Sequence, residues 1–160
     1  MGSWSVKTVD GADVRLRSGR IGIVTVDVTA PVTSGQLHVA DDGVRLSLVL
    51  ALDQLRTRNF LWERAARALV KRHEAHALTY AGAGPAQSSP WQIVGHARSG
   101  DIDLELQLTA TPSGPSHDPL SEIELMGSAA VGTVHLPFPG LGTVDDFSFD
   151  VDARLAMRPH

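Results

Sequence analysis

Cysteine is absent from this chain of 160 residues. Disulfide bonds, thiolate metal sites and cysteine nucleophiles are therefore excluded. Lysine occurs only at Lys7 and Lys71, and acidic residues outnumber basic ones, giving a formal net charge of -4. Because duplex nucleic acid selects a basic surface, we expect no nucleic-acid partner.

Long hydrophobic runs are missing as well. No apolar segment approaches the roughly 20 residues of a membrane-spanning helix. Residues Met1–Ser5 lack the basic and apolar regions of a secretory signal. We therefore expect a soluble, cytoplasmic protein. The length corresponds to one domain, residues 1–160, which is large enough to bury a core without a covalent staple.

Motifs for common cofactors and catalytic sites are also missing. The chain has no phosphate-binding loop, no dinucleotide fingerprint and no Gly-x-Ser-x-Gly nucleophile elbow. The segment His73-Glu-Ala-His76 places its two histidines three residues apart, which is not the zinc-binding His-Glu-x-x-His pattern. We read these histidines as the end of a helix. We expect no metal and no cofactor, and we assign no catalytic residue.

The dominant feature of the sequence is an alternation of apolar and polar residues. It is strictest over residues 101–110 and recurs over 147–157, 44–50 and 24–28. Because successive side chains of a strand point to opposite faces, each segment predicts a strand with one buried and one wet face. Weaker strands are expected at Trp4–Thr8, Val14–Arg17, Gln36–Val39, Leu78–Tyr80, Trp91–Ala97 and Glu122–Leu136.

Turn signals separate these strands. They include Asp10-Gly11, Ser18-Gly19, Asp41-Asp42-Gly43 and Ser99-Gly100, which are typical of hairpins and predict antiparallel neighbours. Residues 81–90 and 111–119 are rich in glycine, proline, serine and alanine and are expected to be surface loops. About eight evenly spaced strands indicate a sandwich or a barrel.

One segment departs from the alternation. Phe60–Glu74 lacks glycine and proline and predicts a single amphipathic helix over one side or opening of the sheet. Its apolar stripe includes Leu61, Trp62 and Leu69, and a second face carries Arg64, Arg67 and Lys71. This basic row is interpreted either as a solvated helix face or as a contact for an anionic membrane or head group.

Several segments in order resemble the YceI-like family of polyisoprenoid-binding, lipocalin-like barrels. They are Trp4–Lys7, Gly35–Val39, Leu46–Asn59, His76–Gly82 and Ile93–Gly95. The resemblance covers most of the chain. It implies an all-β, antiparallel barrel whose apolar tunnel holds a long isoprenoid tail, such as that of a quinone or a polyprenyl phosphate, without catalysis.

The chain also departs from the family pattern. No His-Ser pair follows the first strand, Asn59 stands where aspartate is usual, and Ser99-Gly100-Asp101 replaces a Gly-x-Thr turn. The family's late Arg-x-x-Phe-Gly motif is missing too. These departures affect the identity of the ligand more than the fold.

Our first functional hypothesis is therefore a non-enzymatic carrier or store for a long apolar ligand, an isoprenoid lipid or quinone. The side chains expected to line the tunnel are Leu46, Leu48, Trp62, Leu69, Tyr80, Leu104, Leu106, Leu108, Phe147 and Phe149. One alternative is a barrel enzyme that acts on a small hydrophobic substrate through an inward histidine and carboxylate. Another is a filled barrel that pairs with a partner protein or, as a homodimer, with itself.

Overall fold

Ten β-strands form the protein in the computed structural model. It describes residues 2–9, 11–21, 24–57, 63, 64, 67, 71, 76–87, 89–100, 102–113, 120–135 and 143–160; side chains are described for these except at 18–21, 24–26, 102, 130–135 and 143–147. The strands are β1 (Gly2–Val6), β2 (Asp13–Ile21), β3 (Val24–Ala40), β4 (Gly43–Ala51), β5 (Arg56–Thr57), β6 (Ala77–Gly84), β7 (Trp91–Ser99), β8 (Ile102–Ser113), β9 (Glu122–His135) and β10 (Thr143–Pro159), with a 3-10 turn η1 (Leu52–Gln54) after β4.

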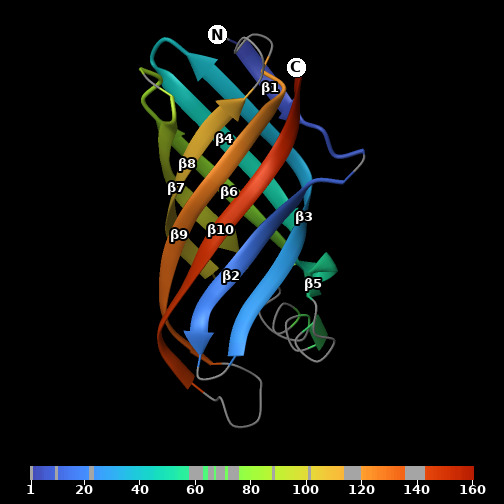
Figure 1. Ribbon diagram of the computed structural model, residues 1–160, viewed down its shortest axis with the longest axis vertical. Helices are drawn as coiled ribbons and strands as arrows, with labels where there is room; N and C mark the ends of the chain where they lie inside the picture. The colour runs from blue at the N-terminus through green and yellow to red at the C-terminus, as the bar shows by residue number, and fades with distance from the viewer. Residues whose placement is uncertain are drawn as a thin grey trace.

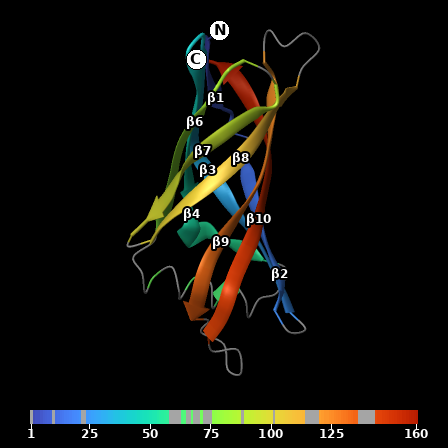
Figure 2. The same cartoon turned by 90° about the vertical axis from the view of Figure 1, so that its left-hand side faces the viewer.

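Eight of the strands close into an antiparallel barrel. Their order is β10-β2-β3-β4-β6-β7-β8-β9, and β9 pairs again with β10, which completes the ring. The strands run obliquely around the barrel, and Figure 2 shows β7 and β8 side by side. The alternation in the sequence thus predicted the class of fold correctly, and closure removes the free sheet edges.

One position in the ring is filled by two strands in succession. β1 pairs with β10 through Trp4–Val6 and with β3 through Gly2–Ser5. Further along the barrel β2 takes the same place between β10 and β3. Both chain ends lie at the end of the barrel that contains β1 (Figure 1), and we call this end the terminal end and the other the distal end.

The structure corrects three of the expected boundaries. Ser18-Gly19 is not a turn but lies inside β2, where the register with β3 shifts between Arg17 and Arg20. The expected strands at 24–28 and 36–39 are parts of the single 17-residue strand β3. Residues 81–84 of the expected loop belong to β6, and residues 111–113 of the other belong to β8.

The expected amphipathic helix is not delimited as an element of the structure. Over residues 60–74 only Glu63, Arg64, Arg67 and Lys71 are described, and these four are helical. The remainder of the segment, including Trp62 and Leu69, lies outside the described residues. Within the described part of the chain the complete helical element is η1, and no helix there is long and apolar enough to cross a bilayer.

The turn at Ser99-Gly100 is confirmed. It joins β7 to β8, and Gly100 has a φ of 57°. This left-handed conformation is strained for residues that carry a Cβ atom, which explains the glycine.

Candidate ligand-binding interior

The terminal half of the barrel is filled with side chains. Leu37, Ile93, Ile123 and Leu155 come from four different strands, and each is 0% exposed. Their burial follows from the period of two along each strand, which turns one apolar row of every strand inward. At the terminal rim, Trp4 and Trp91 pack as half-buried side chains against this core.

Tyr80 occupies the middle of the interior. The side chain of this β6 residue is buried, and its hydroxyl donates a hydrogen bond to the backbone carbonyl of Leu106 in β8 at 3.1 Å. Because β7 lies between β6 and β8 in the sheet, this bond joins strands that are not neighbours. Burial raises the pKa of the Tyr80 hydroxyl to about 12, so the phenol is neutral at physiological pH.

Two paired glycines allow close packing here: Gly82 leaves space for the tyrosine ring, and Gly95 lets β6 and β7 approach each other. Gly82 of β6 is opposite Gly95 of β7. A Cβ atom on Gly82 would lie 2.6 Å from the Tyr80 hydroxyl oxygen, and one on Gly95 would overlap the backbone carbonyl of Ala81. Side chains at these positions would displace either the tyrosine or the neighbouring strand, so the glycines allow the close packing here.

The distal half of the barrel is less completely filled. Leu16, Val28, Leu104 and Phe149 belong to the inward rows of β2, β3, β8 and β10, yet they are only half-buried. Inward side chains that keep accessible surface offer apolar surface on the inner side of the wall. The wall from β4, η1 and β7 at this end is tighter, with buried Leu50, Leu52 and Ala97.

Most of the side chains predicted to line a tunnel point into the barrel. The buried ones are Leu46, Leu48, Tyr80, Leu106 and Leu108, and the half-buried ones are Leu104 and Phe149. Trp62, Leu69 and the side chain of Phe147 lie outside the described part of the structure. These side chains point inward, as expected from their alternate positions along each strand. Their contact with a ligand remains a prediction.

Two features of the interior were not predicted. The inward positions of Leu16 and Val28 were not assigned to the tunnel, although their alternation with Arg17 and Asp27 is a usable signal. The glycine pair on β6 and β7 was also missed, because glycines at 82 and 84 are equally typical of a turn. The contact that requires them is between strands and leaves no trace in local sequence.

The described interior holds very little polar chemistry. Ser99 is the one buried residue of the polar or charged class among the described residues, and its hydroxyl donates to the carbonyl of Ala77 at 2.6 Å. The inward histidine and carboxylate of the enzyme hypothesis do not occur among the described side chains. His38, His76, His96 and His160 are exposed.

Three of the exposed histidines, His38, His96 and His160, bond to side chains on the surface. His38 bonds to Ser3 at 2.8 Å, and His96 bonds to Asp103 at 3.1 Å. No group of three potential metal ligands is found among the described residues. His73 lies outside them, so the His73 and His76 pattern is not tested.

The predicted basic row is exposed, and one of its three residues forms an ion pair. Arg64, Arg67 and Lys71 are all exposed. Arg67 forms an ion pair with Glu63, one helical turn earlier, at 3.0 Å. This neighbour was not included in the sequence interpretation, and its charge reduces the positive potential that the row would present to an anionic surface.

Comparison with known proteins supports the fold alone. The structure is similar to the crystal structure of BcnA from Burkholderia cenocepacia, with a TM-score of 0.63 and 11% sequence identity over 94% of this chain and 98% of that chain. Neither a family sequence profile nor a curated protein sequence matches the chain. The barrel architecture therefore has a solved counterpart that covers nearly its whole length.

Proposed function

We propose that this protein binds a long apolar ligand in the distal half of its barrel, as a carrier or store and not as a catalyst. The observation that carries the proposal is the set of half-buried inward side chains, Leu16, Val28, Leu104 and Phe149. Such surface gains free energy when an apolar molecule replaces water, at about 25 cal/mol per Å² buried.

The filled terminal half defines how the ligand would enter. Tyr80 and the fully buried leucines and isoleucines beyond it leave that half occupied by the protein's own side chains. The ligand tail would therefore enter from the distal end and stop near Tyr80. The proposed site would be a blind apolar pocket, and not the tunnel that the family resemblance implies.

An isoprenoid lipid or quinone is the ligand class that we favour. The segments that resemble, in the same order, the YceI-like family support this class, and the similarity to BcnA supports only the barrel that would hold it. Each buried methylene group contributes about 0.8 kcal/mol, so a chain of several isoprene units gives useful affinity without any polar contact.

Binding without catalysis is supported by the composition of the described interior. Its walls present leucine, valine, isoleucine, alanine and one tyrosine whose hydroxyl already donates to a carbonyl. A general acid or base needs a titratable group near the working pH within reach of the substrate. The phenol of Tyr80, with a pKa near 12, does not meet that requirement.

We further propose that Arg64, Arg67 and Lys71 guide the protein to an anionic membrane, from which a poorly soluble ligand has to be collected. These residues lie in the connection between β5 and β6 and are exposed. Each basic residue near such a surface contributes about 1 kcal/mol. The pairing of Arg67 with Glu63 makes the attachment weaker than three free charges would give.

The test is native mass spectrometry of freshly purified protein, followed by organic extraction and analysis of the extract. The proposal expects a bound species that is released by organic solvent and has the mass and fragmentation of a long-chain isoprenoid. If the extract contains only short or polar molecules, and added polyprenyl phosphate in detergent does not bind, the proposed function is wrong.

A further inference from the structure

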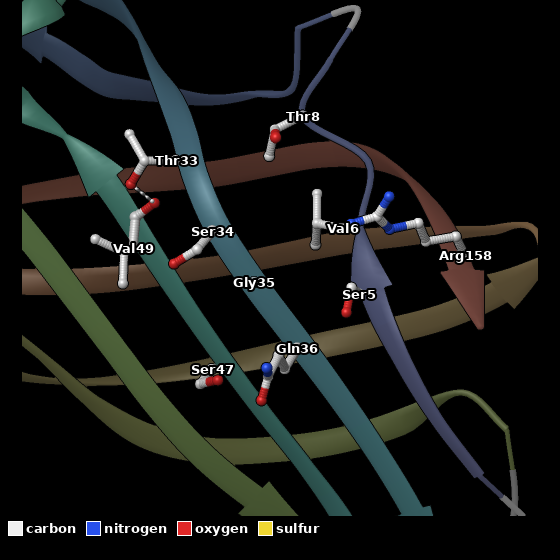
Figure 3. A pocket seen from close by; sticks show the side chains of 10 residues that line it. All are labelled: Ser5, Val6, Thr8, Thr33, Ser34, Gly35, Gln36, Ser47, Val49 and Arg158. Carbon is white, nitrogen blue, oxygen red and sulfur yellow. Dashed lines mark hydrogen bonds between the residues drawn. The ribbon is translucent and has the colours of Figure 1, made fainter. Parts of the chain in front are cut away.

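A row of polar side chains crosses four strands on the outer face of the terminal end. Arg158 of β10 is opposite Ser5 of β1, and Ser5 is opposite Gln36 of β3. Gln36 is in turn opposite Ser47 of β4. Side chains opposite one another in adjacent strands are neighbours on the same face. The four strands therefore present one guanidinium, one amide and two hydroxyl groups side by side (Figure 3).

A cavity adjoins this row at the place where β1 leaves the sheet. β3 pairs with β1 over residues 36–39 and with β2 over residues 24–31, and the N–H of Val32 donates to the carbonyl of Ala12, so residues 33–35 have no strand partner on that side. The cavity measures about 270 Å³ and is lined by Ser5, Val6, Thr8, Thr33, Ser34, Gly35, Gln36, Ser47, Val49 and Arg158. Drug-sized sites typically measure about 300–1,000 Å³, so a smaller molecule is the appropriate occupant.

A β-bulge adds a further hydroxyl group to the lining. Val32 is opposite Leu50 and Ser34 is opposite Val49, so Thr33 is an extra residue in β3. As a result Thr33 and Ser34 are both exposed, although they are consecutive. The Thr33 hydroxyl donates to the carbonyl of Val49 at 3.2 Å, while Ser34 projects beside it. Bulges of this kind often redirect side chains next to functional sites.

The charge of the cavity is unusual for this molecule. Its lining contains Arg158 and no carboxylate, whereas the chain as a whole has a net charge of -4. Arg158 forms no ion pair within the part of the chain that the structure describes. Most other arginines with described side chains are paired with carboxylates: Arg15, Arg17, Arg45, Arg56, Arg67, Arg98 and Arg154.

We propose that this outer cavity binds a small hydroxylated anion, of the size of a monosaccharide and with one phosphate or carboxylate group. Arg158 would bind the anionic group, because a guanidinium offers paired donors that match both phosphate and carboxylate. Ser34, Ser47 and Gln36 would bind the hydroxyl groups, since each can both donate and accept hydrogen bonds.

This site opens on the outer face of the barrel, and Val6 is the residue of its lining that also belongs to the buried core. On β3 and β4 the side chains that line it belong to the outward rows, apart from Gly35, whereas Leu37, Leu46 and Leu48 of the same strands point inward and are buried. The inference goes beyond the proposed function, and its test uses no apolar ligand. The two proposals can therefore fail independently.

The test is a titration followed by backbone amide NMR, with glucose 6-phosphate, glucuronate, glucose and inorganic phosphate as separate probes. We expect saturable shifts at Ser5, Ser34, Gln36 and Ser47 with at least one of the two sugar anions. Their relative affinities identify the anionic group. Glucose, which lacks the charge, and inorganic phosphate, which lacks the carbon-bound hydroxyls, should each bind more weakly than the preferred sugar anion.

Two variants separate a specific contact from general charge attraction. Arg158→Gln should weaken binding of the preferred sugar anion by about tenfold or more, the loss given by a hydrogen bond to a charged group. Arg154→Gln removes the same charge from the same strand, at a residue outside the cavity lining, and should change the affinity by less than about twofold. Equal affinity in the two variants, or no saturable shift in the cavity with either sugar anion, would overturn the proposal.

Discussion

The two halves of the barrel are made from the same strands, yet they differ in how completely side chains fill them. Along β8, Leu108 and Leu106 are buried, whereas Leu104 on the same inward row is half-buried. Along β10, Leu155 is fully buried and Phe149 is half-buried. Alternation therefore decides which side of the wall a residue faces, and the neighbours across the interior decide whether space remains beside it.

Tyr80 lies at the boundary between the two halves. Its ring occupies the space beside Gly82, and its hydroxyl bonds to the Leu106 carbonyl. One large side chain, made possible by a small residue next to it, can thus divide a barrel into a structural part and a part that is able to hold a ligand.

A charge introduced at an inward position gives the largest expected loss of stability. It also tests directly whether the two halves of the barrel differ in burial. Leu106→Asp should lower the free energy of unfolding by at least about 3 kcal/mol, because the carboxylate would be buried without a partner. Leu104→Asp, two residues earlier on the same row, should cost only about 1–2 kcal/mol because water reaches that position. Urea unfolding of both variants measures the difference, with outward Glu105→Asp as the control. Equal losses for the two leucine variants would show that the halves do not differ.

The close approach of β6 and β7 gives the next largest effect. Gly95→Ala should destabilise the protein by about 2–3 kcal/mol, because the added carbon overlaps backbone atoms of Ala81 and Gly82, which cannot move without disturbing the sheet. Gly82→Ala meets the side chains of Tyr80 and Ile93 and should cost about 1–2 kcal/mol. Urea unfolding midpoints would rank the two, and a larger loss for Gly82→Ala would contradict this packing.

The Tyr80 hydroxyl gives a smaller effect that depends on pH. Tyr80→Phe should cost about 1 kcal/mol at neutral pH, through loss of the bond to the Leu106 carbonyl. The folded pKa of about 12 lies above the ordinary tyrosine pKa of 10.0, so the hydroxyl's contribution to stability is complete below pH 10. It is lost as pH rises from 10 to 12, by up to about 1.4 kcal/mol per pH unit.

Because the chain contains one tyrosine, the near-ultraviolet absorbance of tyrosinate follows this group alone. Folded protein should titrate near pH 12 and urea-unfolded protein near pH 10. Stability curves of the native protein and Tyr80→Phe should converge and then cross as the pH rises through this window, because ionisation of the unfolded phenol outweighs the single hydrogen bond. A phenol that titrates at the same pH in both states would mean that Tyr80 is not buried at the boundary.

The basic row Arg64, Arg67 and Lys71 gives the smallest expected effect, which is on the rate of ligand transfer from membranes. Changing Arg64, Arg67 and Lys71 together to glutamate should slow ligand transfer from anionic vesicles severalfold, and added salt should slow transfer by the native protein in the same way. Affinity for ligand in detergent should change little, because the interior is untouched. Transfer that is equally fast from neutral vesicles, and indifferent to salt, would assign the row to an ordinary solvated surface.

Sequence patterns predicted the wall of the barrel well. The rows at residues 44–50 and 101–110 correspond to β4 and β8, and the turn at Ser99-Gly100 is where it was expected. These features depend on the two-residue period of a strand and on local backbone conformation, and both are determined by residues that are neighbours in the sequence.

The remaining features depend on contacts between distant residues. Gly82 and Gly84 resemble a turn in the sequence but lie in β6, where a Cβ atom would overlap Tyr80 and Ile93 at Gly82 and the Gln92 carbonyl at Gly84. The cavity beside Arg158 arises where β1 ends before β2 begins, and where a bulge at Thr33 turns two consecutive hydroxyls outward. Neither the pairing nor the bulge has a local signal that could have been read in advance.

The most direct test of the central claim is ligand binding by a variant in which the distal half is filled. Leu104→Trp adds a large ring on the inward row of β8 in the distal half, whereas Glu105→Trp places the same ring on the outer face of the same strand. A titration with polyprenyl phosphate in detergent should show native affinity for Glu105→Trp and at least a tenfold loss for Leu104→Trp, with both variants folded by circular dichroism. Undiminished binding by folded Leu104→Trp would contradict a ligand site in the distal half.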